Sequence, residues 1–150
     1  MSCTYTSLLA HVTFSTKRRQ PFITPNLEAR LLPYLGGIAR QLGAKILVSN
    51  SVADHVHLLV NLPPTLAVSE AVGKLKGSSS KWIHDSFPEQ QSFAWQRGFG
   101  AFSVSRSNVP SVARYIEGQK EHHRRVTFQE ELVLLLRRHR IDFDDRYLGD

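Results

Sequence analysis

Two short patterns in the sequence bring together side chains that can do chemistry. The first is His55-Val56-His57, which lies in an apolar run typical of a β-strand. Because side chains alternate between the faces of a strand, the two imidazoles would stand side by side while Val56 packs on the other face. The pattern predicts a pair of ligands for a divalent cation. The alternative is a structural role, since a partly buried histidine often only satisfies a backbone group.

The second pattern is Tyr115 followed four residues later by Gln119. On a helix these two side chains share one face, and Val112 and Ile116 form the neighbouring apolar stripe. Viewed alone, the pattern is more typical of a surface tyrosine beside a solvated glutamine. Gly118 lies inside this helix at a cost of about 1 kcal/mol relative to alanine, which favours a close approach or a hinge at that point.

The elements that must position these residues follow from apolar periodicity and turn residues. We expect strands at residues 7–14, 45–49, 55–60 and 101–105, and helices at 25–42, 68–84, 109–123 and 128–139. The order predicts a single α+β domain over residues 1–150, with a ferredoxin-like (RRM-like) split βαβ fold and an antiparallel sheet of four or more strands. Helices would cover one sheet face and leave the other open, and the C-terminal helices would carry the tyrosine.

Composition and charge narrow the class of partner. The chain has 150 residues, of which 41% are hydrophobic, and no apolar run approaches the roughly 20 residues that span a bilayer, so no membrane partner is expected. The net charge of +6 favours a polyanion, and Lys17, Arg18 and Lys74 are candidates for phosphate contacts. A lone Cys3 and the lack of a secretory signal predict a cytoplasmic protein. Without a G-x-x-x-x-G-K-[ST] loop, no nucleotide cofactor is expected.

Several longer motifs accompany the two patterns. They are Asp54-His-Val-His-Leu, Leu75-Lys-Gly-Ser-Ser, Trp95-Gln-Arg-Gly-Phe-Gly-Ala-Phe-Ser-Val-Ser105, Tyr115-Ile-Glu-Gly-Gln-Lys-Glu-His-His123 and Phe143-Asp-Asp-Arg-Tyr147. In this order and at this chain length they resemble the single-tyrosine HUH transposases of the insertion sequence 200/605 family, including the REP-associated tyrosine transposases. The likeness runs from about Leu8 to Leu148.

The resemblance implies a role for each residue of the two patterns. His55 and His57 fall on two metal ligands, Gln119 on the third and Tyr115 on the nucleophile. Such an enzyme uses Mg²⁺ or Mn²⁺ to cleave and rejoin single-stranded DNA at hairpin-marked ends, through a 5′-phosphotyrosine intermediate. The resemblance also implies a homodimer in which the tyrosine helix completes the active site of the partner.

Two other functions fit part of the sequence. An RRM-type module also holds single-stranded nucleic acid on an open sheet, but it uses aromatic residues on the central strands, where this chain has His55 and His57. A domesticated relative would keep the strand-cleaving site and act on repeated genomic hairpins. The difference between that relative and a mobile element lies in the DNA context, not in the chain.

Overall fold

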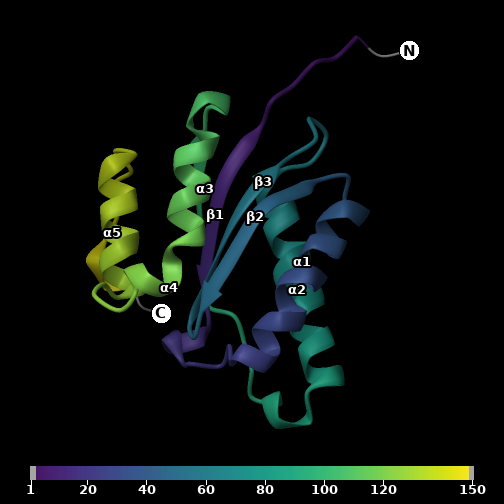
Figure 1. Cartoon of the computed structure of the whole chain (residues 1–150), viewed down its shortest axis with the longest axis vertical. Coiled ribbons are helices and arrows are strands. Elements are labelled where there is room, and N and C mark those ends of the chain that lie inside the picture. Colours follow the sequence, from purple (N-terminus) through teal and green to yellow (C-terminus); the bar gives the residue numbers. More distant parts are fainter. Residues whose placement is uncertain (1–2, 149–150) are drawn as a thin grey trace.

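The computed structural model describes residues 3–148, which form an antiparallel sheet with helices on both sides (Figure 1). The strands are β1 (Leu9–Ser15), β2 (Lys45–Val52), β3 (His55–Asn61) and β4 (Gly100–Val104), in the spatial order β2-β3-β1-β4. β3 and β1 are therefore the central strands. This order and the β-α-β-β-α-β succession confirm the predicted α+β, ferredoxin-like fold.

The helices form two groups that differ in the sheet face they cover. α1 (Pro25–Gln41) and α2 (Val68–Ser86) lie together on one side, and α3 (Val109–Glu117), α4 (Gln119–His122) and α5 (Phe128–Arg138) lie on the other (Figure 1). In residues 3–148, short 3₁₀ helices lie between these elements at η1 (Lys17–Arg19), η2 (Pro88–Gln90) and η3 (Arg106–Asn108), and η4 (Asp145–Tyr147) follows α5.

The ends of α1 follow local signals in the sequence. The Thr24 hydroxyl accepts a hydrogen bond from the backbone N–H of Leu27, and Pro25 occupies the first helical position. Gly43 follows the helix with a φ of 79°, a conformation that glycine adopts without steric cost. α1 therefore begins and ends where the sequence predicts.

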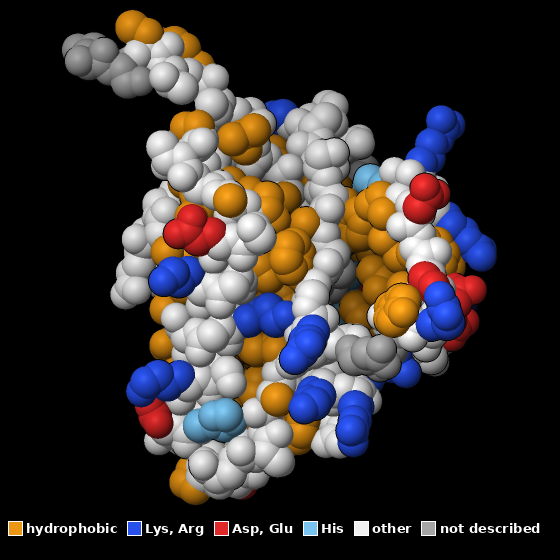
Figure 2. Space-filling view, turned by 180° about the vertical axis from the view of Figure 1, so that it is seen from behind, with side chains coloured by type: hydrophobic (Ala, Val, Ile, Leu, Met, Phe, Trp, Pro, Cys, Tyr) orange, Lys and Arg blue, Asp and Glu red, His pale blue; other side chains and the backbone are white. Residues whose placement is uncertain are grey.

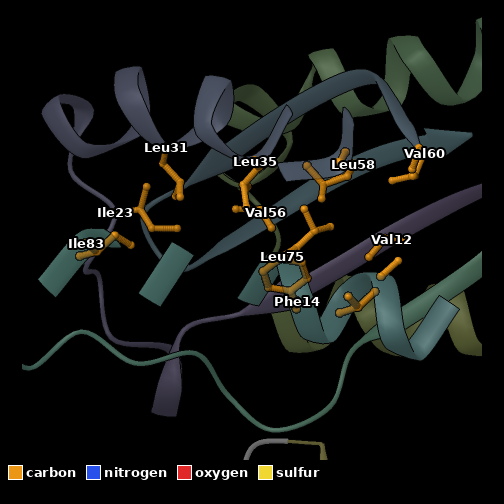
Figure 3. Packing of buried hydrophobic residues seen from close by; sticks show 14 of the residues in the cluster. Val12, Phe14, Ile23, Leu31, Leu35, Val56, Leu58, Val60, Leu75 and Ile83 are labelled. Carbon is orange, nitrogen blue, oxygen red and sulfur yellow. The ribbon is translucent and has the colours of Figure 1, made fainter. Parts of the chain in front are cut away.

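The main hydrophobic core lies between the sheet and the pair α1 and α2. Alternate residues of the central strands point into it, and leucines of both helices meet them there (Figure 3). Its most buried members include Phe14, Val56, Leu58, Leu31 and Leu75. Because strand side chains alternate, this packing directs the intervening histidines of β3 to the opposite face.

The expectation that this opposite face stays open is wrong, because α3, α4 and α5 cover it. Leu59, which shares the face with the histidines, is completely buried. A second apolar cluster forms there from Phe102, Leu135, Leu136 and Leu148. Leu148 also shows that the C-terminal tail docks on the domain. The appended helices thus form a third layer and bury the polar centre of the sheet.

The helix expected over residues 109–123 is divided at Gly118 into α3 and α4. The amide of Asn50 on β2 donates hydrogen bonds to the carbonyl oxygens of Ile116 and Glu117, at 2.9 and 3.2 Å, so these carbonyls are satisfied from outside the helix. A Cβ atom at residue 118 would lie 3.3 Å from the Arg114 carbonyl oxygen. This close approach accounts for the glycine inside the pattern.

Among the described residues, no helix is long and apolar enough to cross a membrane. Seen from behind, Lys and Arg side chains gather over the lower half of the molecule (Figure 2). That is the end at which β1 runs into η1 (Figure 1). The positive charge of the chain is therefore unevenly distributed over this face.

Truncation of a central core residue should measure how much the sheet packing stabilises the fold. Leu58→Ala leaves a cavity under α1 and α2 and should lower the free energy of unfolding by about 2–5 kcal/mol, measured by urea denaturation. Leu134→Ala is the matched control, because Leu134 is 54% exposed on α5, and it should change stability by less than about 0.5 kcal/mol. Equal losses in the two variants would contradict this assignment of the core.

Candidate functional site

Strand β3 places His55 and His57 side by side on the covered face of the sheet. Their ring centroids are 5.1 Å apart, and both side chains are completely buried. Val56 between them points to the main core, as strand alternation predicts. The central position of β3 keeps both imidazoles away from either sheet edge.

Both imidazoles turn toward the carboxylate of Glu131 on α5. The Nε2 atoms of His57, His123 and His55 lie 2.8, 3.1 and 3.4 Å from Glu131 Oε1. Glu131 is only 1% exposed. These four side chains offer ligand atoms that all lie within 4.8 Å of one another, and this donor set could hold a divalent cation.

Sequence reasoning missed Glu131 and His123 as members of this cluster. A signal for Glu131 exists: with Phe128 and Leu135 it forms one helix face, where a carboxylate interrupts an apolar stripe. Such a face indicates a buried charge that needs a partner. His123 follows α4 as its C-terminal cap, and its proximity to β3 depends on the bend at Gly118, which no local pattern specifies.

The outer nitrogen of each imidazole has its own partner. His55 Nδ1 lies 2.7 Å from Asp54 Oδ1, and His123 Nδ1 lies 2.6 Å from the Val126 carbonyl oxygen. His57 Nδ1 lies 2.7 Å from His11 Nε2 on β1. This is how ligating histidines are oriented in metal sites, with the second nitrogen held by a carboxylate, a carbonyl or another polar group.

Burial sets the charge states in the cluster. It lowers the pKa of His11 to about 3 and that of His57 to about 4, so both are neutral at physiological pH. Burial acts against ionisation of Glu131, but hydrogen bonds from His123, His55 and His57 hold its pKa well below the usual range. An ionised carboxylate therefore lies among imidazoles.

Tyr115 reaches the same carboxylate from α3. Its hydroxyl donates a hydrogen bond to Glu131 Oε2, and its ring centroid lies 5.9 Å from that of His57. Burial and the bond to Glu131 raise the pKa of Tyr115 above its ordinary value, so the proton stays on the phenol. The structure thus brings His55, His57 and Tyr115 together around the carboxylate of Glu131. They are three of the four residues of the two sequence patterns.

Gln119, the fourth, is buried beside Tyr115 but is not joined to the imidazoles. Its Nε2 donates to the Tyr115 carbonyl oxygen at 3.3 Å, and its Oε1 is a buried oxygen without a hydrogen-bond partner. Among the contacts of residues 3–148, none links this side chain to His55 or His57. Its unpaired oxygen is free to accept a ligand, and its role as third metal ligand stays a prediction.

The tyrosine helix is anchored on its own chain. Lys120 donates hydrogen bonds to Asn50 Oδ1 and Glu28 Oε2, at 2.8 and 3.0 Å, and Asn50 in turn holds the last carbonyls of α3. The single chain therefore contains His55, His57 and Tyr115 in one site. Completion of the site by a partner chain stays a prediction of the resemblance.

The three basic residues predicted to contact DNA lie in two places. Lys17 and Arg18 are exposed in η1, which continues β1 directly past Ser15, the residue paired with His55. The backbone N–H of Thr16 also bonds to the Asp54 carbonyl oxygen, which holds η1 close to the histidine end of β3. Lys74 is exposed on α2, on the other side of the sheet, so the structure does not bring it to this site.

A cavity of about 330 Å³ opens beside Tyr115. It lies between β4, α3 and α5, and its lining includes His11, Ser103 and Arg138. Part of a ligand the size of a nucleotide would fit such a space. The tyrosine therefore borders both the buried cluster and a cavity that is open to ligand.

Comparison with known proteins identifies the family. A family model described as "Transposase IS200 like" matches residues 4–119. The transposase for insertion sequence element IS200 of Salmonella typhimurium is 32% identical over 121 residues, which cover 74% of this chain and 76% of that protein. The ISDra2 transposase TnpA of Deinococcus radiodurans is 26% identical over 116 residues, covering 74% and 83% of the two chains.

Solved structures agree with this result. A putative transposase from Deinococcus radiodurans superposes with a TM-score of 0.67 and 25% identity, covering 79% of this chain and 95% of that one. A REP-associated tyrosine transposase bound to a REP hairpin has the same fold, with a TM-score of 0.60, 16% identity, and coverage of 82% and 73%. Given these matches, together with the tyrosine and histidines that meet on one face of the sheet, the chain belongs to the IS200-like transposase family.

Proposed function

We propose that this transposase cleaves and rejoins single-stranded DNA through a covalent bond to Tyr115, with a divalent cation held beside it. The observation that carries the proposal is the meeting of the Tyr115 hydroxyl with the carboxylate on which His55 and His57 converge. A tyrosine next to a cluster that could hold a metal ion suits nucleophilic attack on a phosphate. The HUH type of the enzyme follows from the same pair of histidines.

The reaction exchanges one ester bond for another. Tyr115 Oη forms a bond to the phosphorus, the bond from phosphorus to the 3′ oxygen breaks, and that oxygen leaves as a hydroxyl after taking up a proton. The phenolic proton leaves as the new bond forms. The 5′-phosphotyrosine keeps the energy of the broken bond, so attack by another 3′-hydroxyl rejoins DNA without a nucleotide cofactor.

Residues of this chain would bind the cation and position the tyrosine for this reaction. His55, His57 and the predicted third ligand Gln119 would hold Mg²⁺ or Mn²⁺, which would supply positive charge for the phosphate oxygens. His11 holds the outer nitrogen of His57 and so fixes the direction of its ligating nitrogen. Asn50 and Lys120 anchor the helix that carries the tyrosine.

The substrate proposed here is single-stranded DNA that carries a hairpin. The positive end of the molecule, with Lys17 and Arg18 beside the histidine end of β3, supports phosphate binding near the site. A structural neighbour was solved with a REP hairpin, and the shared fold makes a hairpin the first substrate to test. Assembly as a homodimer is part of the same proposal. Because one chain already brings Tyr115 to His55 and His57, completion of the site in trans stays an expectation of the resemblance. Whether the hairpin marks an element's end or a genomic repeat distinguishes a mobile enzyme from a domesticated one.

Substitution of the nucleophile tests the reaction class. Wild-type protein with labelled hairpin oligonucleotides and Mn²⁺ should give a covalent protein–DNA adduct on denaturing gels, and Tyr115→Phe should give none, because phenylalanine has no attacking oxygen. Tyr147→Phe is the matched control, since Tyr147 is 68% exposed. DNA that is retarded on native gels but gives no adduct on denaturing gels, over a pool of randomised flanks, would instead indicate a binding module.

Removal of the cation or of one ligand should stop the same reaction. EDTA, or His57→Ala, should lower adduct formation by at least about 100-fold, because the charge on the phosphate is no longer compensated. His84→Ala is the control, since His84 lies on α2 and its side chain bonds to the Phe93 carbonyl oxygen, away from the cluster. An adduct that forms equally well in EDTA would rule out a metal-dependent mechanism.

Neutralisation of η1 tests where the DNA backbone runs. Lys17→Ala and Arg18→Ala should each weaken hairpin binding and reduce the salt dependence of log K by about 0.7 per lost phosphate contact. Lys45→Ala is the control, because Lys45 is exposed at the end of β2 that is paired with Asn61, away from His55 and η1. Lys74→Ala, measured in the same way, decides whether DNA also follows α2. Unchanged slopes for the η1 variants would remove Lys17 and Arg18 from the DNA path.

A further inference from the structure

The ligating nitrogens of the cluster can be identified from their neighbours. The Val126 carbonyl oxygen can only accept, so His123 Nδ1 carries the hydrogen. The carboxylate of Asp54 likewise receives the hydrogen of His55 Nδ1. In the neutral rings, both Nε2 atoms then present lone pairs, and they face each other at 3.0 Å.

Each Nε2 can bind a metal ion only through its lone pair. In the metal-free protein a proton on Nε2 takes the place of the metal and bonds to Glu131. His57 also directs its Nε2 toward Glu131, because its Nδ1 is hydrogen-bonded to His11 Nε2. A divalent cation would satisfy all three nitrogens and the carboxylate oxygen at once.

Four of the six separations within the cluster match those between ligands of one metal ion. Metal bonds of about 2.1 Å place neighbouring ligand atoms about 3.0 Å apart at right angles and about 3.4 Å apart in a tetrahedron. The separations are 3.0 Å for His55 and His123, 2.8 Å for His57 and Glu131, and 3.1 and 3.4 Å from Glu131 to His123 and His55. All ligand atoms of the cluster lie within 4.8 Å of one another, so these four pairs could share one ion with little movement.

We propose that, before DNA binds, this chain holds its metal with four ligands, two of them supplied by the segment after the tyrosine: His55, His57, His123 and Glu131. Gln119, the third ligand that the resemblance implies, is not among these four. The family match ends at residue 119, so His123 and Glu131 lie outside the part of the chain that it covers. Three imidazoles and a carboxylate suit Mn²⁺ or Zn²⁺ better than Mg²⁺, which favours oxygen ligands.

The same ligands would close the site when no DNA is bound. Glu131 contributes one oxygen to the cluster and accepts the Tyr115 hydrogen bond with the other. While it stays there, it occupies a coordination position and keeps the Tyr115 hydroxyl bonded to itself. A DNA phosphate would have to take the place of Glu131, which frees Tyr115. This closing role rests on the proposed function, whereas the ligand set does not.

The ligand set can be counted in the wild-type protein. X-ray absorption of the Mn²⁺-loaded full chain should show three imidazoles, and two would overturn the proposal. Glu131→Gln should weaken Mn²⁺ binding, followed by the EPR signal of free Mn²⁺, by at least tenfold, while the exposed Glu89→Gln leaves it unchanged. Equal affinity for Glu131→Gln and wild type would also overturn it. The wild-type count does not depend on how well a variant folds.

The closing role is measured separately, by adduct formation at saturating Mn²⁺. Glu131→Gln should form the Tyr115 adduct at least as fast as wild type, because the nucleophile is no longer held. A metal-saturated Glu131→Gln protein that forms no adduct, beside an active wild type, would overturn the closing role. Three imidazoles with no adduct from wild type would refute the proposed function and leave the ligand set intact.

Discussion

The carboxylate of Glu131 is a buried charge, and the polar half of the molecule is arranged around it. An isolated carboxylate in an apolar interior would cost several kcal/mol, so it must be met by donors or by a cation. Imidazoles from β3 and from the end of α4, and the phenol of α3, all turn toward it. If α5 did not dock, these groups would have no common partner.

This arrangement depends on the separation of the sheet into two faces. One face is apolar and packs on α1 and α2, where Val56 and Leu58 of β3 are completely buried. The other carries His55 and His57 between the same residues. A shift of β3 by one residue would exchange the faces and place two imidazoles in the main core. The apolar packing of one face therefore determines that His55 and His57 point to the other face.

Local sequence patterns were sufficient to predict the strands of the sheet, because alternating apolar residues and turn residues are encoded within a few positions. The same alternation predicted that His55 and His57 share a face, and helical spacing placed Tyr115 near Gln119. The third layer was not predictable in this way: whether α5 covers the sheet depends on contacts between Leu148, Phe102 and Leu135, which are distant in sequence. Glu131 was missed for that reason, although its position on an apolar stripe was visible.

The resting state of Tyr115, the proposed nucleophile, follows from the same buried charge. A phenol that donates to a strongly acidic carboxylate does not lose its proton to it, because the pKa of Tyr115 is raised while that of Glu131 is lowered. Glu131 in this position is therefore a poor general base. In the proposed reaction, the phenol would exchange this partner for the phosphate, and the cavity beside Tyr115 offers a space through which a strand could approach. In the proposed mechanism, a strand that does not displace Glu131 from Tyr115 would not be cleaved.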